Sequence, residues 1–498
     1  MVKSMKSRTL KIILIILTVV LSFACFLGYP LYNWYRKTYD ATFTILVFTV
    51  QSPMKGANLG VVKGAIKSCI PGGFLWLLFM AVFFYVLHKK PEGKISTYLS
   101  CFAPAVCGIG LIVLLILANK TLEFTDYIKF RYSETYFIEE HYVEPDVSKI
   151  KAKDKPRNLI YIYMESVETA YASEDVGGRQ PDVNYIPNLT EIADENISFS
   201  NTDKLGGFYN CAHTGWTSAA LFSTQSGVPF MTPVGGGGIW ENFGALITIG
   251  DILADKGFKQ EFICGSDAEF GGRRALFSTH GDAKIMDYPA AVDAGYVDED
   301  HYVWWGFEDF MLYDIAQQEL EELASGDQPF NLTLLTVDTH DDGGYICELC
   351  TDDYPVQIAN VISCADRQVA EFVEWCSEQS WYDDTVIVIQ GDHPARTKYL
   401  LEGIPANERT TYNCFINTVF DKSGVSFSNR AFVAMDMMPT VLTAIGFEVP
   451  GDRLGLGTDL FSDTQTLTEE YGFDYIDSEL EKHSQWFLDN IVWGDMSE

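Results

Sequence analysis

The stretch Leu159-Ile160-Tyr161-Ile162-Tyr163-Met164-Glu165-Ser166 decides the fold. An apolar and aromatic run ends abruptly in a carboxylate. Similar apolar runs lie downstream, at residues 261–264, 332–337 and 386–389. Runs of this length without a polar alternation are typical of strands that are buried on both faces, as in a parallel sheet. We therefore expect each run to be an interior strand.

Helical patterns separate these strands. Residues 310–324 and 365–379 both carry apolar side chains at helical spacing. Alternating strands and helices favour an α/β fold with a mostly parallel sheet and helices on both sides. We predict that this domain covers residues 158–498, after a linker at 121–157.

The charges are unevenly distributed along the chain. Of 35 Lys and Arg and 68 Asp and Glu residues, 13 basic and 2 acidic residues lie in 1–120, which leaves 22 and 66 for the rest. The net charges are therefore +11 and −44. An acidic body argues against a nucleic-acid partner, because phosphates are bound by Lys and Arg. The split indicates a basic, apolar head and an acidic, soluble body.

The head contains three apolar runs long enough to cross a bilayer, at residues 10–28, 72–87 and 101–118. Lysines before the first run, and Lys89, Lys90 and Lys94 after the second, favour the cytoplasmic side. The sequence thus predicts that residues 1–120 form a multi-pass anchor in the cell membrane and that the body lies outside the cytoplasm. Two observations oppose this prediction. The first run has the alternative of a signal peptide, and three lysines fall on the predicted outer loop: Lys55, Lys63 and Lys67.

A polar group follows each predicted strand. The four runs lead into Glu165-Ser166, Gly265-Ser266-Asp267, Asp338-Thr339-His340 and Asp392-His393. Ligands of open α/β sheets bind beyond the carboxyl ends of the strands, so these groups should converge on one edge. Glu165, Asp392 and His393 would suit Mn²⁺, Zn²⁺ or Mg²⁺. The alternative is that such carboxylates merely cap the following helices.

Thr217 is the candidate nucleophile, at the predicted start of a helix through Leu221 and Phe222. A hydroxyl at a helix N-terminus lies beside free N–H groups that suit phosphate, and a metal would make its alkoxide accessible. The alternatives are that Thr217 is only an N-cap, or that a neighbouring residue is the nucleophile. These neighbours are Cys211, Thr214 and Ser218.

The loop after the second strand carries Asp267, Arg273 and Arg274 among glycines. Arginine can bind a phosphoryl group through two parallel hydrogen bonds. The alternative is a solvated loop. Since the body is acidic, we expect Arg273, Arg274 and His340 to form a local positive pocket.

Cys347 and Cys350 form a C-x-x-C pair. A second such pair, which would complete a familiar zinc pattern, does not occur in the sequence. A local disulfide and simple burial remain open.

Together these motifs resemble the lipoteichoic acid synthase and phosphoglycerol transferase family. This family consists of membrane-anchored members of the alkaline phosphatase/sulfatase superfamily, and the resemblance is closer to the phosphoglycerol transferase I type. It covers about residues 120–460. The motifs that carry it are Tyr163-Met164-Glu165-Ser166, Thr217 with Ser223–Pro229, Thr336–His340, Gly391-Asp392-His393, Phe137–Val143, Leu276–Gly281 and Asp436–Thr440.

The resemblance implies roles for individual residues. Glu165, Thr217, Asp392 and His393 would hold one divalent metal, with Mn²⁺ expected and Mg²⁺ or Zn²⁺ as alternatives. Thr217 would be the nucleophile. The substrate-binding residues would be His340, Arg273 and Asp267. Family members with a tryptophan near this arginine use it as a substrate contact, whereas the matching residue here is Gly271.

The implied reaction has two steps. Thr217 would take glycerol phosphate from phosphatidylglycerol, and a polyglycerolphosphate or glycan acceptor would then receive it. A phosphoethanolamine transferase, a sulfatase-like phosphodiesterase and a non-catalytic surface binding protein are the alternatives. A sulfatase proper would carry C-x-P-x-R, but Cys211 is followed by Ala212-His213-Thr214-Gly215.

Overall fold

The protein is described by a computed structural model that divides into two compact units. One unit consists of Met1–Thr44 and Asn58–Ile128, and the other of Ile45–Ala57 and Lys129–Glu498. The residues described are 2–38, 42–51, 55, 60–89, 94–152, 154–231, 245–340, 343–396, 399–405, 408–420 and 426–494.

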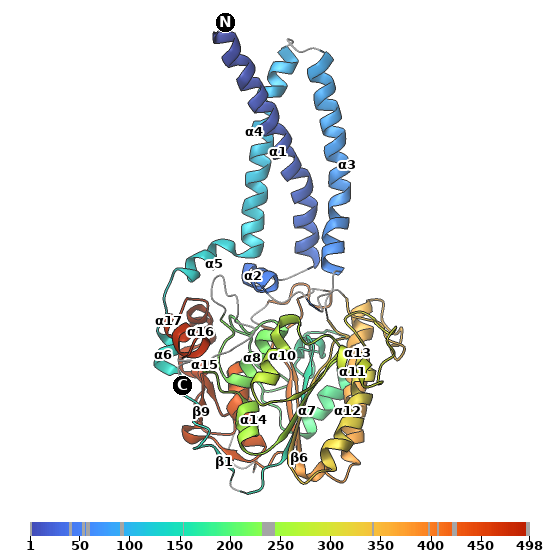
Figure 1. The fold of residues 1–498 in the computed structure, drawn as a ribbon, viewed down its shortest axis with the longest axis vertical. Helices are drawn as coiled ribbons and strands as arrows, with labels where there is room; N and C mark the ends of the chain where they lie inside the picture. The colour runs from blue at the N-terminus through green and yellow to red at the C-terminus, as the bar shows by residue number, and fades with distance from the viewer. Residues whose placement is uncertain are drawn as a thin grey trace. The chain divides into compact units, whose positions relative to one another are not determined.

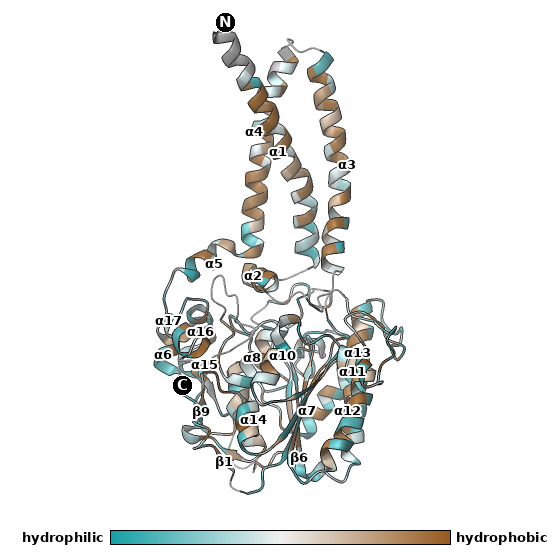
Figure 2. Cartoon of the chain, viewed as in Figure 1, coloured by the Kyte–Doolittle hydropathy of each residue, from teal (hydrophilic) through white to brown (hydrophobic). Residues whose placement is uncertain are grey.

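The first unit is built from long apolar helices (Figure 2). They are α1 (Val2–Thr38), α3 (Gly60–Lys89) and α4 (Lys94–Leu122). The next helix, α5 (Phe124–Arg131), begins in this unit and ends in the other. In the described part of the chain, three stretches are long and apolar enough to span a membrane: Thr9–Thr38, Val62–Lys89 and Tyr98–Leu122. The chain is therefore a membrane protein. Lys90, which entered the orientation argument, lies outside the described residues.

Close packing joins α1 to both of its neighbours. The ring of Phe23 meets the edge of Trp76, with centroids 5.1 Å apart, and the Trp76 indole N–H donates to Ser22 Oγ at 3.1 Å. Away from these contacts the apolar side chains face outward; Leu10, Phe74 and Ile109, for example, are all more than half exposed. Such an exterior is stable in lipid and not in water.

The body contains a six-stranded sheet, to which the β6 arrow of Figure 1 belongs. The order of its strands is β4-β3-β5-β2-β6-β7. The first five strands in that order are mutually parallel, and β7 is antiparallel to β6. The strands are β2 (Asn158–Met164), β3 (Lys259–Cys264), β4 (Lys284–Met286), β5 (Phe330–Leu335), β6 (Thr385–Gly391) and β7 (Asn413–Ile416). Four of them match the apolar runs, so the predicted α/β class with a mostly parallel sheet is confirmed.

Alternate residues of β2 face two separate cores. Tyr161 and Tyr163 pack with one apolar cluster, whereas Ile160 and Ile162 pack with the other, and all four are completely buried. Helices cover both faces, as expected for a strand that is apolar throughout. The first cluster takes in α8 (Thr217–Ser226), α9 (Ile249–Asp255), α10 (Arg273–Thr279) and α14 (Met437–Ala444); the second takes in α7 (Pro187–Glu195), α11 (Tyr288–Asp293), α12 (Asp309–Ala324) and α13 (Gln357–Ser377).

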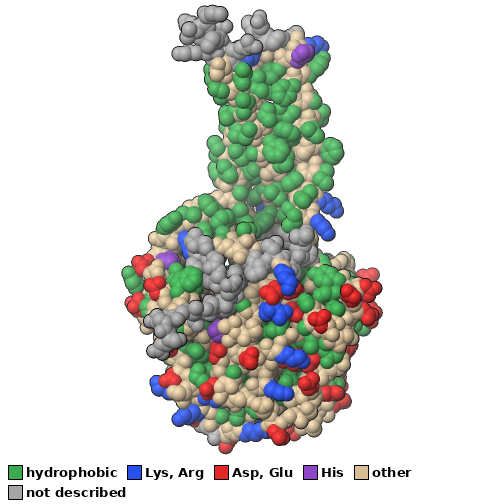
Figure 3. Space-filling view, in the orientation of Figure 1, with side chains coloured by type: hydrophobic (Ala, Val, Ile, Leu, Met, Phe, Trp, Pro, Cys, Tyr) green, Lys and Arg blue, Asp and Glu red, His purple; other side chains and the backbone are tan. Residues whose placement is uncertain are grey.

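Small elements complete the body. Short strands pair as β1 (Lys151–Ala152) with β8 (Phe447–Glu448) and β9 (Arg453–Leu454) with β10 (Gly457–Thr458). The remaining helices are α6 (Phe137–His141), α15 (Leu467–Tyr471), α16 (Phe473–Leu480) and α17 (Gln485–Phe487). The face of the body drawn in Figure 3 carries scattered carboxylates among lysines and arginines.

Candidate active site

The carboxyl ends of β2 and β6 lie level, since Met164 pairs with Gly391. The residues that follow therefore meet. The Nε2 atom of His393 lies 3.6 Å from Glu165 Oε1 and 3.5 Å from Asp392 Oδ2, and all three side chains are buried. Their potential ligand atoms all lie within 4.8 Å of one another.

The backbone holds this cluster through Asp392. Its Oδ1 atom accepts hydrogen bonds from the backbone N–H groups of Ser166 and His393, both at 2.7 Å. Ser166 takes a left-handed conformation, with φ of 56°, immediately after β2. A non-glycine residue in this region costs about 1 kcal/mol or more and is kept where surrounding contacts demand it. Ser166 contacts both carboxylates, because its hydroxyl also donates to Glu165 Oε1 at 2.6 Å.

Thr217 is the first residue of α8 and points into the cluster. Its hydroxyl donates to Glu165 Oε2 at 3.1 Å and lies 3.3 Å from His393 Nε2. Trp216 occupies the N-cap position and makes no side-chain cap bond. Thr217 is thus not an N-cap.

The neighbouring candidates for the nucleophile have other surroundings. Thr214 is completely buried, and its hydroxyl donates to the carbonyl of Cys211 at 2.8 Å. Burial raises the pKa of the Cys211 thiol far above its ordinary value, so a thiolate there is strongly disfavoured. Ser218 lies against Gly271, since a Cβ built on that glycine would come within 2.3 Å of Ser218 Oγ.

The donor set fits a divalent cation. Asp392 Oδ2 is buried and has no hydrogen-bond partner among the described residues. His393 Nδ1 lies 2.9 Å from the Pro394 carbonyl oxygen, so Nδ1 carries the proton and Nε2 offers its lone pair to the cluster. Two carboxylates, an imidazole and a hydroxyl are ligands that Mn²⁺, Mg²⁺ or Zn²⁺ would accept.

The protonation states support the same conclusion. Burial acts to raise the pKa of Glu165, but His340 and His393 outweigh it and lower that pKa to about 2. Burial lowers the pKa of His393 to about 4. Burial and the Glu165 charge raise the pKa of Asp392 well above its usual range. Two carboxylates this close repel each other unless a proton or a cation lies between them.

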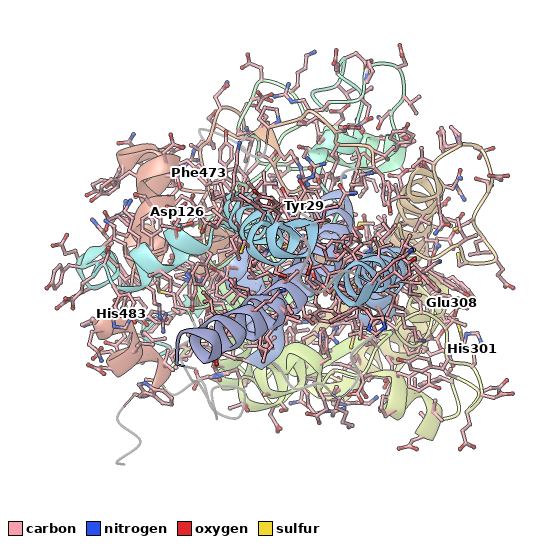
Figure 4. The ribbon with its side chains drawn as sticks, turned by 90° about the horizontal axis from the view of Figure 1, so that it is seen from above. Tyr29, Asp126, His301, Glu308, Phe473 and His483 are labelled. Atoms are coloured by element: carbon pink, nitrogen blue, oxygen red, sulfur yellow. The ribbon has the colours of Figure 1, made fainter. Side chains whose placement is uncertain are left out.

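His340 follows β5 and lies close enough to lower the pKa of Glu165. Its ring packs on Trp305, with centroids 4.8 Å apart. Trp305 belongs to a loop pinned beyond β3 by the bond from Phe307 N–H to the Gly265 carbonyl at 2.9 Å. His301 and Glu308 lie beside each other in Figure 4, and His301 Nε2 is 2.7 Å from Glu308 Oε2. This contact joins the two ends of the loop that contains Trp305.

Arg273 is buried, and its guanidinium is held by its own loop. Its Nε and Nη2 atoms donate to the carbonyl oxygens of Phe270 and Asp267 at 3.0 and 2.9 Å. Arg274 forms ion pairs with Glu269 at 3.0 Å and Asp287 at 2.5 Å. The expectation that Arg274 adds to a positive pocket is therefore wrong, because these carboxylates neutralise it.

The segment Ile45–Ala57 belongs to the same compact unit as the body. It includes most of α2 (Phe43–Gln51). Phe48 is buried against Trp216, with ring centroids 5.0 Å apart, and also contacts Phe230 at 5.9 Å. Lys55 Nζ lies 3.4 Å from Asp267 Oδ2. This segment thus reaches the residue before Thr217 and the loop of Arg273.

One functional residue was missed from the sequence, and one residue expected at the site lies outside the cluster. Arg396, three residues after His393, is close enough to lower the pKa values of both Glu165 and His393. Its Nε atom is buried without a hydrogen-bond partner among the described residues. Asp338 does not join the cluster, since its Oδ2 lies 3.3 Å from the backbone nitrogen of Asp309, and burial raises its pKa to about 10.

The class of protein follows from this fold. A crystal structure of a protein in the alkaline phosphatase superfamily from Vibrio parahaemolyticus superposes with a TM-score of 0.50 at 23% identity, covering 66% of this chain and 77% of that one. The fold is thus that of the alkaline phosphatase superfamily. The family model described as Sulfatase matches residues 157–447. The chain belongs to the sulfatase family.

Curated relatives share sequence over much of the chain. A phosphoglycerol transferase I from Escherichia coli O6:K15:H31 (strain 536 / UPEC) is 32% identical over 344 residues, which is 66% of this chain and 42% of that protein. A phosphoglycerol transferase I from Salmonella choleraesuis (strain SC-B67) is 29% identical over 485 residues, or 91% of this chain and 57% of that protein. The chain thus spans about half the length of these relatives.

Proposed function

We propose that the protein is a membrane-bound, metal-dependent phosphotransferase that moves glycerol phosphate from phosphatidylglycerol to a hydroxyl acceptor through Thr217. The observation that carries this proposal is the position of the Thr217 hydroxyl. It lies at the N-terminus of α8 and within 3.3 Å of both Glu165 and His393. The names of the curated relatives support the transferred group.

Glu165, Asp392, His393 and Thr217 would hold the ion, with Mn²⁺ expected and Mg²⁺ or Zn²⁺ as alternatives. When bound, a divalent ion stabilises negative charge on the nucleophile and on the transferring phosphoryl group. The proposal for the metal rests on Asp392 Oδ2, which has no hydrogen-bond partner among the described residues, and on the lone pair that His393 Nε2 offers to the cluster.

In the first step, Thr217 Oγ1 releases its proton to solvent and attacks the phosphorus of phosphatidylglycerol. A Thr–O–P bond forms, the P–O bond to diacylglycerol breaks, and diacylglycerol leaves as an alcohol after taking up a proton. In the second step, an acceptor hydroxyl releases its proton to solvent and its oxygen attacks the same phosphorus. A new O–P bond forms, the bond from Thr217 Oγ1 to phosphorus breaks, and Oγ1 takes up a proton again. The N-terminus of α8 offers N–H groups and a partial positive charge to the phosphoryl oxygens throughout.

The substrate side is assigned to His340, Arg273 and Asp267. His340 and Arg273 would contact the phosphate, and Asp267 would contact the glycerol hydroxyls. Gly271, with φ of 69°, leaves no room for the tryptophan of other family members. Trp305, which packs on His340, supplies an aromatic wall from a different loop.

We also propose that the chain crosses the membrane several times, with the body outside the cytoplasm. Support comes from Ile45–Ala57, which separates two spanning candidates and yet groups with the body. The loop after α1 would then share the side of the body. Lys55, which opposed the orientation, has a carboxylate partner in Asp267. The acceptor would be a polyglycerolphosphate chain or a glycan on that side.

The test uses the purified full chain in detergent with Mn²⁺ and labelled phosphatidylglycerol. We expect release of diacylglycerol, loss of release with EDTA, and a glycerophosphate adduct on the Thr217 peptide by mass spectrometry. An adduct of phosphoethanolamine, formed from phosphatidylethanolamine instead, would contradict the proposed donor. Neither product nor adduct with either lipid would favour a binding protein and overturn the proposal.

A further inference from the structure

Three cysteines form a second cluster of potential metal ligands, distinct from that of Glu165, Asp392 and His393. Cys347 and Cys350 lie in the connection between β5 and α13, and Cys364 lies on α13 itself. Cys347 Sγ is 3.6 Å from Cys350 Sγ and 3.8 Å from Cys364 Sγ. All three sulfurs lie within 4.8 Å of one another.

These spacings fit sulfurs that share a metal ion. A tetrahedral Zn²⁺ holds thiolates at about 2.3 Å, which places any two sulfurs about 3.8 Å apart. A disulfide would join two sulfurs at about 2.05 Å and leave the third as a thiol packed against it. A disulfide would account for only two of these sulfurs, whereas a thiophilic metal ion would bind all three.

A buried amide lies beside the sulfurs. Gln368, one turn after Cys364 on α13, places Nε2 3.1 Å from Cys364 Sγ and 3.8 Å from Cys347 Sγ. The side chain is buried, and its Oε1 atom has no hydrogen-bond partner among the described residues. Donation from an amide to metal-bound thiolates stabilises their charge and orients them.

We propose that Cys347, Cys350 and Cys364 bind one Zn²⁺, with water in the fourth position. Each thiol loses its proton as its bond to zinc forms, so binding releases protons to solvent. Cys350 is partly exposed, which gives the ion and its water a path to the site. The site is separate from the Glu165 cluster and does not depend on the reaction proposed for it.

The bound ion would tie a loop to a helix. Among the described residues before Cys347, Tyr345 N–H donates to Asp338 O at 2.7 Å and Gly344 N–H donates to His340 O at 3.1 Å. Zinc would fasten the far end of this loop to α13, in addition to the bond from Arg367 Nη2 to Leu349 O at 3.1 Å. His340 lies at the near end of this loop.

The test measures zinc directly. The full chain is purified in detergent with a reductant, equilibrated with Zn²⁺, passed through a desalting column and analysed by metal mass spectrometry. A background of E165A/D392A removes ligands of the proposed catalytic metal. We expect one zinc per chain in this background, loss of that zinc with Cys364→Ser, and retention with Cys376→Ser, which changes another buried cysteine of α13.

Thiol alkylation of the wild type provides a readout that does not depend on how the variants fold. We expect Cys347, Cys350 and Cys364 to resist iodoacetamide until a chelator is added, then to react. Absence of zinc above the level of Cys364→Ser would overturn the proposal. So would a disulfide between any two of the three cysteines in protein isolated without reductant. Absence of diacylglycerol release by the wild type, with zinc bound to the cysteines, would contradict the proposed function and leave the zinc site standing.

Discussion

The ring of Phe48 packs on the indole of Trp216, with centroids 5.0 Å apart and planes inclined by 50°. Trp216 is the residue before Thr217, so a side chain from the segment that follows α1 supports the start of α8. Support from a distant part of the chain matters here, because a shift of about 1 Å in a reacting group can slow a reaction roughly 100-fold.

Replacing Phe48 with alanine tests this contact. We expect Phe48→Ala to lower the rate of diacylglycerol release roughly 10-fold, since the N-terminus of α8 loses its aromatic support. The bound metal should remain, because no proposed ligand changes. Phe43→Ala is the control, since the ring of Phe43 lies 4.8 Å from that of Phe124 instead. Equal rates for Phe48→Ala and Phe43→Ala would contradict the prediction.

The hydroxyl of Thr217 is expected to be indispensable. Thr217→Ala should reduce diacylglycerol release roughly 1,000-fold or more, because no oxygen remains to attack the phosphorus. Thr217→Ser keeps the oxygen and should retain measurable release. Single-turnover assays with labelled lipid check both variants. Full release by the alanine variant would rule out Thr217 as the nucleophile.

Arg396 should contribute to binding the phosphoryl group. Arg396→Gln is expected to lower kcat/KM roughly 10- to 100-fold, since a cation near the Glu165 cluster is removed. Arg396→Lys should recover part of the loss. Arg179→Gln serves as the control, because Arg179 is a half-exposed partner of Glu408. An unchanged kcat/KM for Arg396→Gln would assign Arg396 to structure alone.

A buried ion pair should dominate the stability of the loops around the site. Glu168 receives two hydrogen bonds from Arg409, at 2.7 and 2.6 Å, and a third from the Ala395 backbone at 3.0 Å. Glu168→Gln is expected to lower the free energy of unfolding by about 3–5 kcal/mol, because it leaves a buried guanidinium without its partner charge. The exposed pair of Arg179 and Glu408 gives the control: Glu408→Gln should cost about 0–1 kcal/mol. Equal melting temperatures for Glu168→Gln and Glu408→Gln would contradict the larger contribution expected of the buried pair.

Glu261 should make the stability depend on pH. Burial, followed by the charge of Glu319, raises the pKa of Glu261 to about 8, although Lys284 opposes the shift. Between about pH 4.5 and 8 the folded chain keeps a proton that the unfolded chain has released, so the free energy of unfolding falls as pH rises. Glu261→Gln should remove this contribution, roughly 2–4 kcal/mol between pH 5 and 8. Melting curves of both proteins across this range check it, and parallel curves would contradict it.

The central strands could be predicted from the sequence because burial on both faces leaves an uninterrupted apolar run. The same reasoning missed β4 and β7, which have three and four residues and lie at the sheet edges. Strands this short carry too little pattern to separate from loops. α13 begins at Gln357 instead of near residue 365, because Ile358, Val361 and Ile362 continue its buried face toward the N-terminus.

The residues at the strand ends could also be predicted, since parallel strands deliver their carboxyl ends to one edge. Contacts between distant segments could not. Nothing in the local pattern around Phe48 or Cys364 indicates Trp216 or Cys347 as a neighbour, because these pairs form only when separate elements pack. The sequence position of Arg396 could have indicated a role at the site, since it lies three residues after His393 in the loop that follows β6.

The position of Phe48 also sets a limit on how the protein can be dissected. Cutting the chain at residue 129 to obtain a water-soluble enzyme would remove Phe48 and Lys55 together with the apolar helices. The rings of Trp216 and Phe230 would then lose their contact with Phe48 and be exposed to solvent near the nucleophile. Such a fragment would tend to self-associate through these rings. A soluble version should therefore keep residues 45–57, joined to the body through a flexible tether in place of the membrane helices.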